Sequence, residues 1–130
     1  TPLDVRSRGT QQVIEAMRRH GVRRLVVQTS FGVGDTRDKL PWLYRLIFAL
    51  LLKHQIADTA RQEQVVRASG LDWVLVRPVN LTDGDATDAA FASPRGEVRG
   101  MKVARRQVGR FLAQAVTDAG CVGRSVALSA

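Results

Sequence analysis

The fold is decided by the stretch Ser69-Gly70-Leu71-Asp72-Trp73-Val74-Leu75-Val76-Arg77-Pro78. Its centre is nearly continuous in apolar residues, which is the pattern of a strand covered on both faces in a parallel sheet. A similar run comes earlier in the chain, as Arg24-Leu25-Val26-Val27-Gln28-Thr29-Ser30, and the residues between the two have a mainly helical pattern. That connection is long enough for a crossover, so we predict two parallel strands joined by helices.

Polar residues follow both predicted strands. Thr29 and Ser30 end the first run, and Pro78, Val79 and Asn80 end the second. Ligands of open α/β sheets bind just beyond the carboxyl ends of the strands, so all five are candidate binding residues. By position alone, Ser30 is equally suited to polarise a substrate carbonyl and to cap a turn. Pro78 also suits the end of a strand, and the Asn80 amide could reach a substrate.

The rest of the chain predicts an α/β protein. We expect helices at 3–20, 41–52, 57–68 and 103–117, a last strand at 126–128, and a long loop or small excursion at 81–99. No linker or repeat divides the sequence, so residues 1–130 are interpreted as a single domain. This order of elements is that of the C-terminal half of a doubly wound sheet.

Composition limits the class of protein. The chain has 130 residues, of which 45% are hydrophobic, which excludes a disordered chain. The net charge is +8, but the 17 Arg residues are scattered and aromatic residues are few, so we do not expect nucleic-acid binding. No apolar run reaches the roughly 18 residues of a membrane span, and no membrane partner is expected.

The few residues of special chemistry also constrain the interpretation. Cys121 is the only cysteine, which excludes an internal disulfide and fits a reducing, cytoplasmic location. Two His and one Cys, all far apart, predict no metal site. The chain begins without Met, which suggests a piece of a longer protein.

Several short segments carry a family resemblance, and they keep their order along nearly the whole chain. They are Arg8-Gly9-Thr10, Glu15-Ala16-Met17, His20-Gly21-Val22-Arg23-Arg24, Gln28-Thr29-Ser30, and Ser69-Gly70-Leu71-Asp72-Trp73 followed by Val76-Arg77-Pro78. The sequence resembles an atypical short-chain dehydrogenase/reductase. The nearest branch is the NAD(P)H-binding group that includes NmrA-like proteins and the biliverdin/flavin reductases.

The resemblance implies the C-terminal part of an NAD(P)-binding Rossmann fold. The first strands and the Gly-rich phosphate loop would then lie upstream of Thr1, because Gly32-Val33-Gly34 lacks the third glycine of a dinucleotide fingerprint. The expected cofactor is NAD(P), with NADP preferred. The resemblance places Ser30 beside the nicotinamide and the substrate. It also places the 78–80 segment against the nicotinamide carboxamide, through backbone atoms.

One departure from the wider superfamily bears on activity. The usual Tyr-x-x-x-Lys proton relay is missing: alignment on the family pattern puts Gln55 and Thr59 at those positions, and Tyr44 and Lys53 are wrongly spaced. Neither Gln nor Thr donates a proton near neutral pH. The first hypothesis is therefore an NAD(P)H-dependent oxidoreductase acting on an apolar or aromatic acceptor such as a flavin, quinone or tetrapyrrole. The alternative is an NmrA-like regulator that senses the dinucleotide without turnover.

Two further features leave alternatives open. His54 and Asp58 are four residues apart, so they form either a carboxylate-supported acid or, more commonly, an exposed surface pair. The segment from Trp42 to Leu52 is apolar nearly all round. It would form core or a subunit interface, or else a wall over a flat, apolar substrate. A homo-oligomer, or association with the N-terminal half, is a further expected partner.

Overall fold

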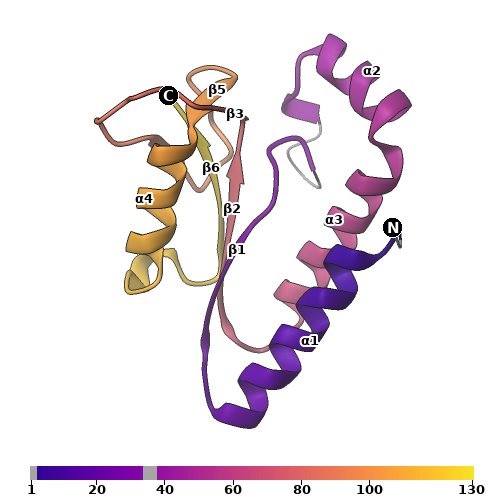
Figure 1. Ribbon diagram of the computed structural model, residues 1–130, viewed down its shortest axis with the longest axis vertical. Coiled ribbons are helices and arrows are strands. Elements are labelled where there is room, and N and C mark those ends of the chain that lie inside the picture. Colours follow the sequence, from indigo (N-terminus) through magenta and orange to yellow (C-terminus); the bar gives the residue numbers. More distant parts are fainter. Residues whose placement is uncertain (1–2, 34–37) are drawn as a thin grey trace. The chain divides into compact units, whose positions relative to one another are not determined.

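The computed structural model describes residues 3–33 and 38–130, apart from the side chain of Phe48. Its chain forms two compact units (Figure 1). The helical unit comprises residues 1–23 and 32–71, and the sheet unit comprises residues 24–31 and 72–130. The single-domain organisation of residues 1–130 stays a prediction.

The sheet unit is built on a four-stranded sheet in the order β1-β2-β6-β4. Strand β1 (Arg24–Gln28) pairs in parallel with β2 (Asp72–Pro78), which pairs in parallel with β6 (Arg124–Ser129). This confirms the predicted parallel pair and the end of the second strand at Pro78. The first strand ends at Gln28, two residues earlier than predicted, and the last strand is longer than predicted.

The centre of this sheet is the most buried part of the sheet unit. Val74, Leu75 and Val76 of β2 are inaccessible to solvent, and Leu128 of β6 is equally buried. Since successive side chains of a strand point to opposite faces, consecutive buried residues are typical of an internal strand of a parallel sheet. Strand β1 lies at one edge of the sheet, so its other edge has no neighbouring strand among the described residues.

Three short strands were missed by the sequence analysis. The segment 81–99 is not one long loop. Strand β3 (Asn80–Thr82) forms its start, and strand β4 (Phe91–Ser93) lies within it. Strand β4 pairs antiparallel with β6, and β3 pairs in parallel with β5 (Lys102–Ala104) in a separate two-stranded sheet. A strand of three residues is too short to show a periodic pattern of apolar residues. Whether it forms depends on the strand with which it pairs.

Helix α4 (Arg105–Ala115) covers one face of the sheet (Figure 1). It is shorter than the predicted helix 103–117, because β5 takes its first two residues. Its C-terminal end is held by β1: the Arg24 guanidinium donates to the carbonyl oxygens of Ala115 and Val116 at 3.0 and 3.1 Å. These carbonyls have no partner within the helix, and a cation suits the negative end of the helix dipole. A short 3₁₀ helix, η2 (Ala119–Cys121), follows.

The helical unit consists of α1 (Val5–His20), α2 (Trp42–Leu51) and α3 (Lys53–Arg67). Helices α1 and α3 pack side by side (Figure 1). The predicted helix 57–68 was wrong at its start, since α3 begins at Lys53. Gly21 ends α1 in the left-handed conformation with φ of 70°, as its position in the sequence predicted. Of the predicted Gly32-Val33-Gly34 loop, Gly34 lies outside the described residues.

Candidate functional site

The two strand ends that the sequence singled out lie next to each other in the sheet unit. After β1, the N–H of Thr29 donates to the Val76 carbonyl oxygen at 2.8 Å. Two residues later, the N–H of Phe31 donates to the Pro78 carbonyl oxygen at 3.0 Å. The segments that contain Ser30 and Pro78 therefore run beside each other past the ends of their strands.

The segment after β2 is fixed by backbone hydrogen bonds on its other side. The N–H of Val79 donates to the Leu128 carbonyl oxygen, and the N–H of Asn80 donates to the Met101 carbonyl oxygen, both at 3.1 Å. Neither N–H can meet a ligand without leaving its partner. A contact between this segment and a nicotinamide carboxamide would therefore need other groups, such as carbonyl oxygens or the Asn80 amide.

Burial separates the candidate residues into two kinds. Thr29, Pro78 and Val79 are buried, whereas Ser30 is half-buried and Asn80 is exposed. A buried side chain presents little surface to a ligand, and the roles of Thr29, Pro78 and Val79 stay predictions. Ser30 and Asn80 are the two candidates with the most accessible side chains at this edge.

Helix α4 anchors the loop that follows β3, and the sequence analysis missed these contacts. Arg105 pairs with Asp83 at 2.6 Å, Gln107 donates through Nε2 to the Asp88 carbonyl oxygen at 3.1 Å, and Arg110 donates to the Thr87 carbonyl oxygen. The loop carries three Asp residues and the first turns of α4 carry three Arg residues. These opposite charges are the feature of the sequence from which the contacts between the loop and α4 could have been predicted. These contacts restrain the chain shortly after Asn80.

His54 and Asp58 were interpreted wrongly from their spacing. Asp58 is 3% exposed, so it is not part of a solvated pair. Its carboxylate instead accepts the N–H groups of Arg6 and Ser7 at 2.8 and 3.2 Å, and the Ser7 hydroxyl. These N–H groups belong to the first turn of α1, where helix donors have no partner within the helix. Asp58 of α3 is thus a cap for α1, supplied by another helix.

The acidity of Asp58 fits this role. Burial of the carboxyl raises its pKa, but hydrogen bonds from the Ser7 side chain and from the Arg6 and Ser7 backbones, with Arg61 nearby, outweigh burial. The pKa of Asp58 therefore lies below its ordinary value, and the group is a carboxylate at neutral pH. This is a structural anion, which does not suit proton transfer.

The positions of the missing proton relay are also occupied structurally. Thr59 is buried, and its hydroxyl donates to the Gln55 carbonyl oxygen at 2.8 Å and accepts from Arg6 at 3.3 Å. Gln55 is exposed. Tyr44 and Lys53 do not share one helix, because α2 ends at Leu51 and α3 begins at Lys53. None of these four residues forms a Tyr–Lys relay.

Other reactive groups do not add to the site. Burial raises the pKa of the Cys121 thiol, and a hydrogen bond to Asp118 raises it further. The thiol therefore stays protonated near neutral pH, which disfavours nucleophilic chemistry. Within residues 3–33 and 38–130, no group of three His, Cys, Asp or Glu side chains is arranged to hold a metal ion.

Comparison with known proteins assigns the chain to a family. The sequence pattern of a family described as NAD(P)H-binding matches residues 2–119, and the chain belongs to that family. This confirms the resemblance to an NAD(P)H-binding family, and the solved structures described next confirm the predicted Rossmann-like α/β fold. The family defines the class of ligand, a nicotinamide dinucleotide.

Several solved structures are similar to this chain, including the following three. A short-chain dehydrogenase/reductase from Veillonella parvula DSM 2008, in complex with NADP, is 17% identical with a TM-score of 0.80 over 99% of this chain and 60% of its own. A Rossmann-fold NAD(P)-binding family protein from Shigella flexneri is 25% identical, with a TM-score of 0.66 over 97% of this chain and 53% of its own. An anaerobillin reductase from Escherichia coli O157:H7 is 21% identical, with a TM-score of 0.75 over 96% and 58%. The chain thus spans a little over half the length of these proteins.

Proposed function

We propose that this chain forms the nicotinamide and acceptor side of an NAD(P)H-dependent oxidoreductase. The observation that carries the proposal is the pair of accessible side chains, Ser30 and Asn80, at the carboxyl ends of the adjacent parallel strands β1 and β2. This edge is where open α/β sheets bind their ligands, and the chain belongs to an NAD(P)H-binding family. Thr29, Pro78 and Val79 shape the cofactor side of the site.

Ser30 has the role of a hydrogen-bond donor to the acceptor. A hydroxyl aimed at a carbonyl oxygen stabilises the negative charge that develops there when hydride arrives at the conjugated system. A bound NAD(P)H would supply the hydride, and water would supply the proton. No side chain of the chain then has to donate that proton, which agrees with Gln55 and Thr59 at the relay positions.

The acceptor class follows from that missing relay. Flavins, quinones and tetrapyrroles spread the added charge over a conjugated ring system, so they do not need a tyrosine acid beside the hydride acceptor. One protein of similar fold is named an anaerobillin reductase, which supports a planar, aromatic acceptor. Another was solved with NADP, which supports NADP as the cofactor. We place the protein in the cytoplasm, in keeping with its single cysteine.

A dinucleotide-sensing regulator of the NmrA-like kind is the second candidate. The structural engagement of Thr59 and Asp58 favours it, because neither group is available to move a proton. The two functions differ in one measurement. Consumption of NADPH in the presence of a panel of flavins, quinones and tetrapyrroles indicates the reductase, and binding of NADPH with no consumption across the panel indicates the regulator.

The site itself is tested by nicotinamide mononucleotide, which carries only the part of the cofactor that this edge would hold. Titration into ¹⁵N-labelled protein should shift the amide signals of Ser30 and Asn80. Ser30→Ala should weaken the response, and the control Thr117→Ala, which removes a hydroxyl from the exposed turn after α4, should not. Shifts confined to other parts of the chain would refute the placement of the nicotinamide.

A further inference from the structure

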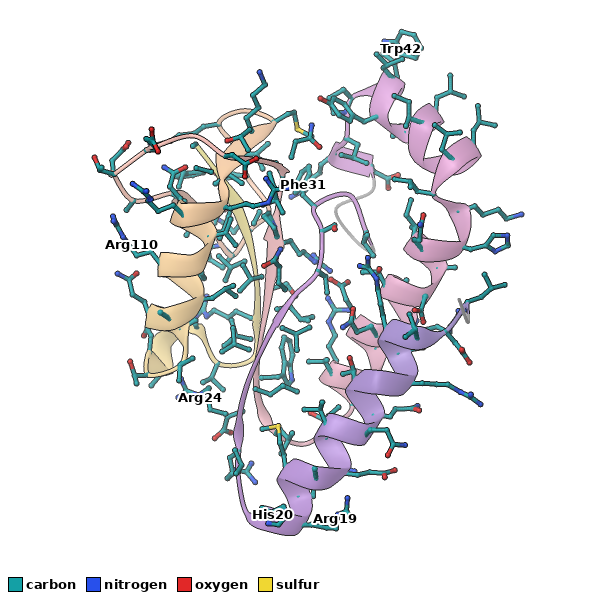
Figure 2. All side chains as sticks on the ribbon, viewed as in Figure 1. Arg19, His20, Arg24, Phe31, Trp42 and Arg110 are labelled. Atoms are coloured by element: carbon teal, nitrogen blue, oxygen red, sulfur yellow. The ribbon has the colours of Figure 1, made fainter. Side chains whose placement is uncertain are left out.

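Helix α2 is unusual in that six of its described large apolar side chains face solvent. Trp42 is 75% exposed, Leu50 is 71% exposed and Leu51 is 75% exposed. Leu43, Leu46 and Ile47 are also exposed. Figure 2 shows Trp42 projecting from the first turn of the helix into open space. Single exposed apolar residues are ordinary, but a continuous group on one short helix marks an interaction surface.

The apolar surface continues beyond the C-terminal end of α2. A pocket of about 440 Å³ lies there within the helical unit, and Leu3, Val5 and Leu51 supply its apolar lining. Leu3 is 62% exposed and Val5 is 52% exposed. Its polar lining comes from Arg6, His54, Gln55 and Asp58. The exposed face of α2 and this pocket together form what we call the apolar ridge.

The segment that carries α2 has basic but no acidic residues, and the Asp58 carboxylate in the pocket is buried and already bonded to α1. Residues 39–57 include Lys39, Arg45 and Lys53 but no Asp or Glu. Asp38 precedes this segment, and its carboxylate lies 3.9 Å from the Arg45 guanidinium. The Asp38 side chain is 91% exposed and the Arg45 side chain is 49% exposed, so their mutual attraction is weak and the cation remains available to a stronger anionic surface.

We propose that the apolar ridge docks this protein onto an anionic lipid surface. The ten residues of α2 extend about 15 Å, half of the roughly 30 Å of a bilayer core, so the helix would lie in the plane of the interface. Leucine side chains then enter the acyl region, Trp42 sits at the boundary, and Arg45 and Lys53 meet lipid phosphates. No described helix is long and apolar enough to cross a membrane, but a surface contact needs no such helix.

A second copy of the chain is a poorer occupant of this surface. A two-fold contact brings each patch against itself, so the cations that border α2 would face a patch whose segment 39–57 has no carboxylate to pair with them. Like charges facing each other across an interface oppose association. An anionic lipid surface satisfies both the apolar face and the cations.

The test is binding to lipid vesicles. The unaltered protein should co-sediment with vesicles of phosphatidylcholine and phosphatidylglycerol, and much less with phosphatidylcholine alone. Arg45→Gln and Lys53→Gln should each lower the vesicle partition coefficient about fivefold, the effect of one basic residue near an anionic surface. Leu46→Gln and Leu50→Gln should each lower it about tenfold or more, since each removes a buried leucine.

Two controls make the result specific to α2. Val116→Gln replaces a similarly exposed apolar residue of the sheet unit and should leave vesicle binding unchanged. In a Trp73→Phe background, Trp42 is the only tryptophan, and its emission should shift to the blue on vesicles. Absence of sedimentation with anionic vesicles, or sedimentation that the α2 substitutions do not reduce, would overturn the proposal. So would a dimer in lipid-free buffer that the same α2 substitutions dissociate. None of these outcomes depends on catalytic activity.

Discussion

Removal of the Asp58 carboxylate should destabilise the helical unit. The carboxylate accepts two backbone N–H groups of α1 and the Ser7 hydroxyl, and it is buried. A hydrogen bond to a charged group contributes about 1.5–3 kcal/mol, and loss of a helix cap costs about 1 kcal/mol. Because the three bonds share one acceptor group, their contributions do not add fully. We expect Asp58→Ala to lower the free energy of unfolding by about 3–4 kcal/mol.

The conservative variant separates charge from hydrogen bonding. Asp58→Asn keeps one acceptor oxygen, so we expect a smaller loss of about 1–2 kcal/mol. Urea unfolding followed by far-ultraviolet circular dichroism measures both values. The matched control is Asp38→Asn, whose carboxylate is 91% exposed and whose substitution should leave stability within experimental error.

The pH dependence gives a second check on Asp58. Its pKa in the folded state lies below its pKa in the unfolded chain. The stability it contributes is therefore complete above the unfolded value of about 4 and is lost as the pH falls through the folded value. Asp58→Asn should lose less stability than the unaltered protein over that acidic window. An Asp58→Ala variant as stable as the Asp38→Asn control would refute the capping role.

Four further predictions concern the site, the cofactor, a turn and assembly. With NADPH and any accepted acceptor, Ser30→Ala should lower kcat by roughly 10²–10³ and change cofactor affinity little, as for an oxyanion donor; an unchanged rate would make Ser30 a turn residue. By calorimetry, the 130-residue chain should bind NADPH much more weakly than the Veillonella parvula protein solved with NADP, because its sequence contains no Gly-rich fingerprint; comparable affinity would refute this. Gly32→Ala should lower the free energy of unfolding by about 1–3 kcal/mol, since φ is +94° and a Cβ would lie 2.4 Å from Leu40 Cδ1; equal stability in urea would show that the turn adapts. Light scattering at micromolar concentration should show association through the open edge of β1, and a stable monomer would show that this edge is covered.

The sequence by itself determined the parts of the fold that depend on residues adjacent in the chain. The apolar runs around Val26 and Val74 predicted two parallel strands, and the structure pairs these two residues directly. Gly21 and Pro78 marked the end of a helix and of a strand because their backbone preferences act within one residue. Their positions just after two apolar runs were enough to make Ser30 and Asn80 candidate site residues, although their chemical role stays a prediction.

Tertiary structure decided what depends on a distant partner. Strand β3 exists because residues 102–104 pair with it, and three residues alone carry no periodic pattern. Asp58 looked like half of a surface pair with His54, yet it caps a helix that begins more than 50 residues earlier in the chain. The apolar pattern of α2 was equally compatible with a place in the core, a subunit interface or a wall over an apolar substrate. The hydrophobicity of a residue does not reveal which part of a protein, if any, covers it. Only the exposure of Trp42 and Leu50 showed that the described chain leaves this face uncovered.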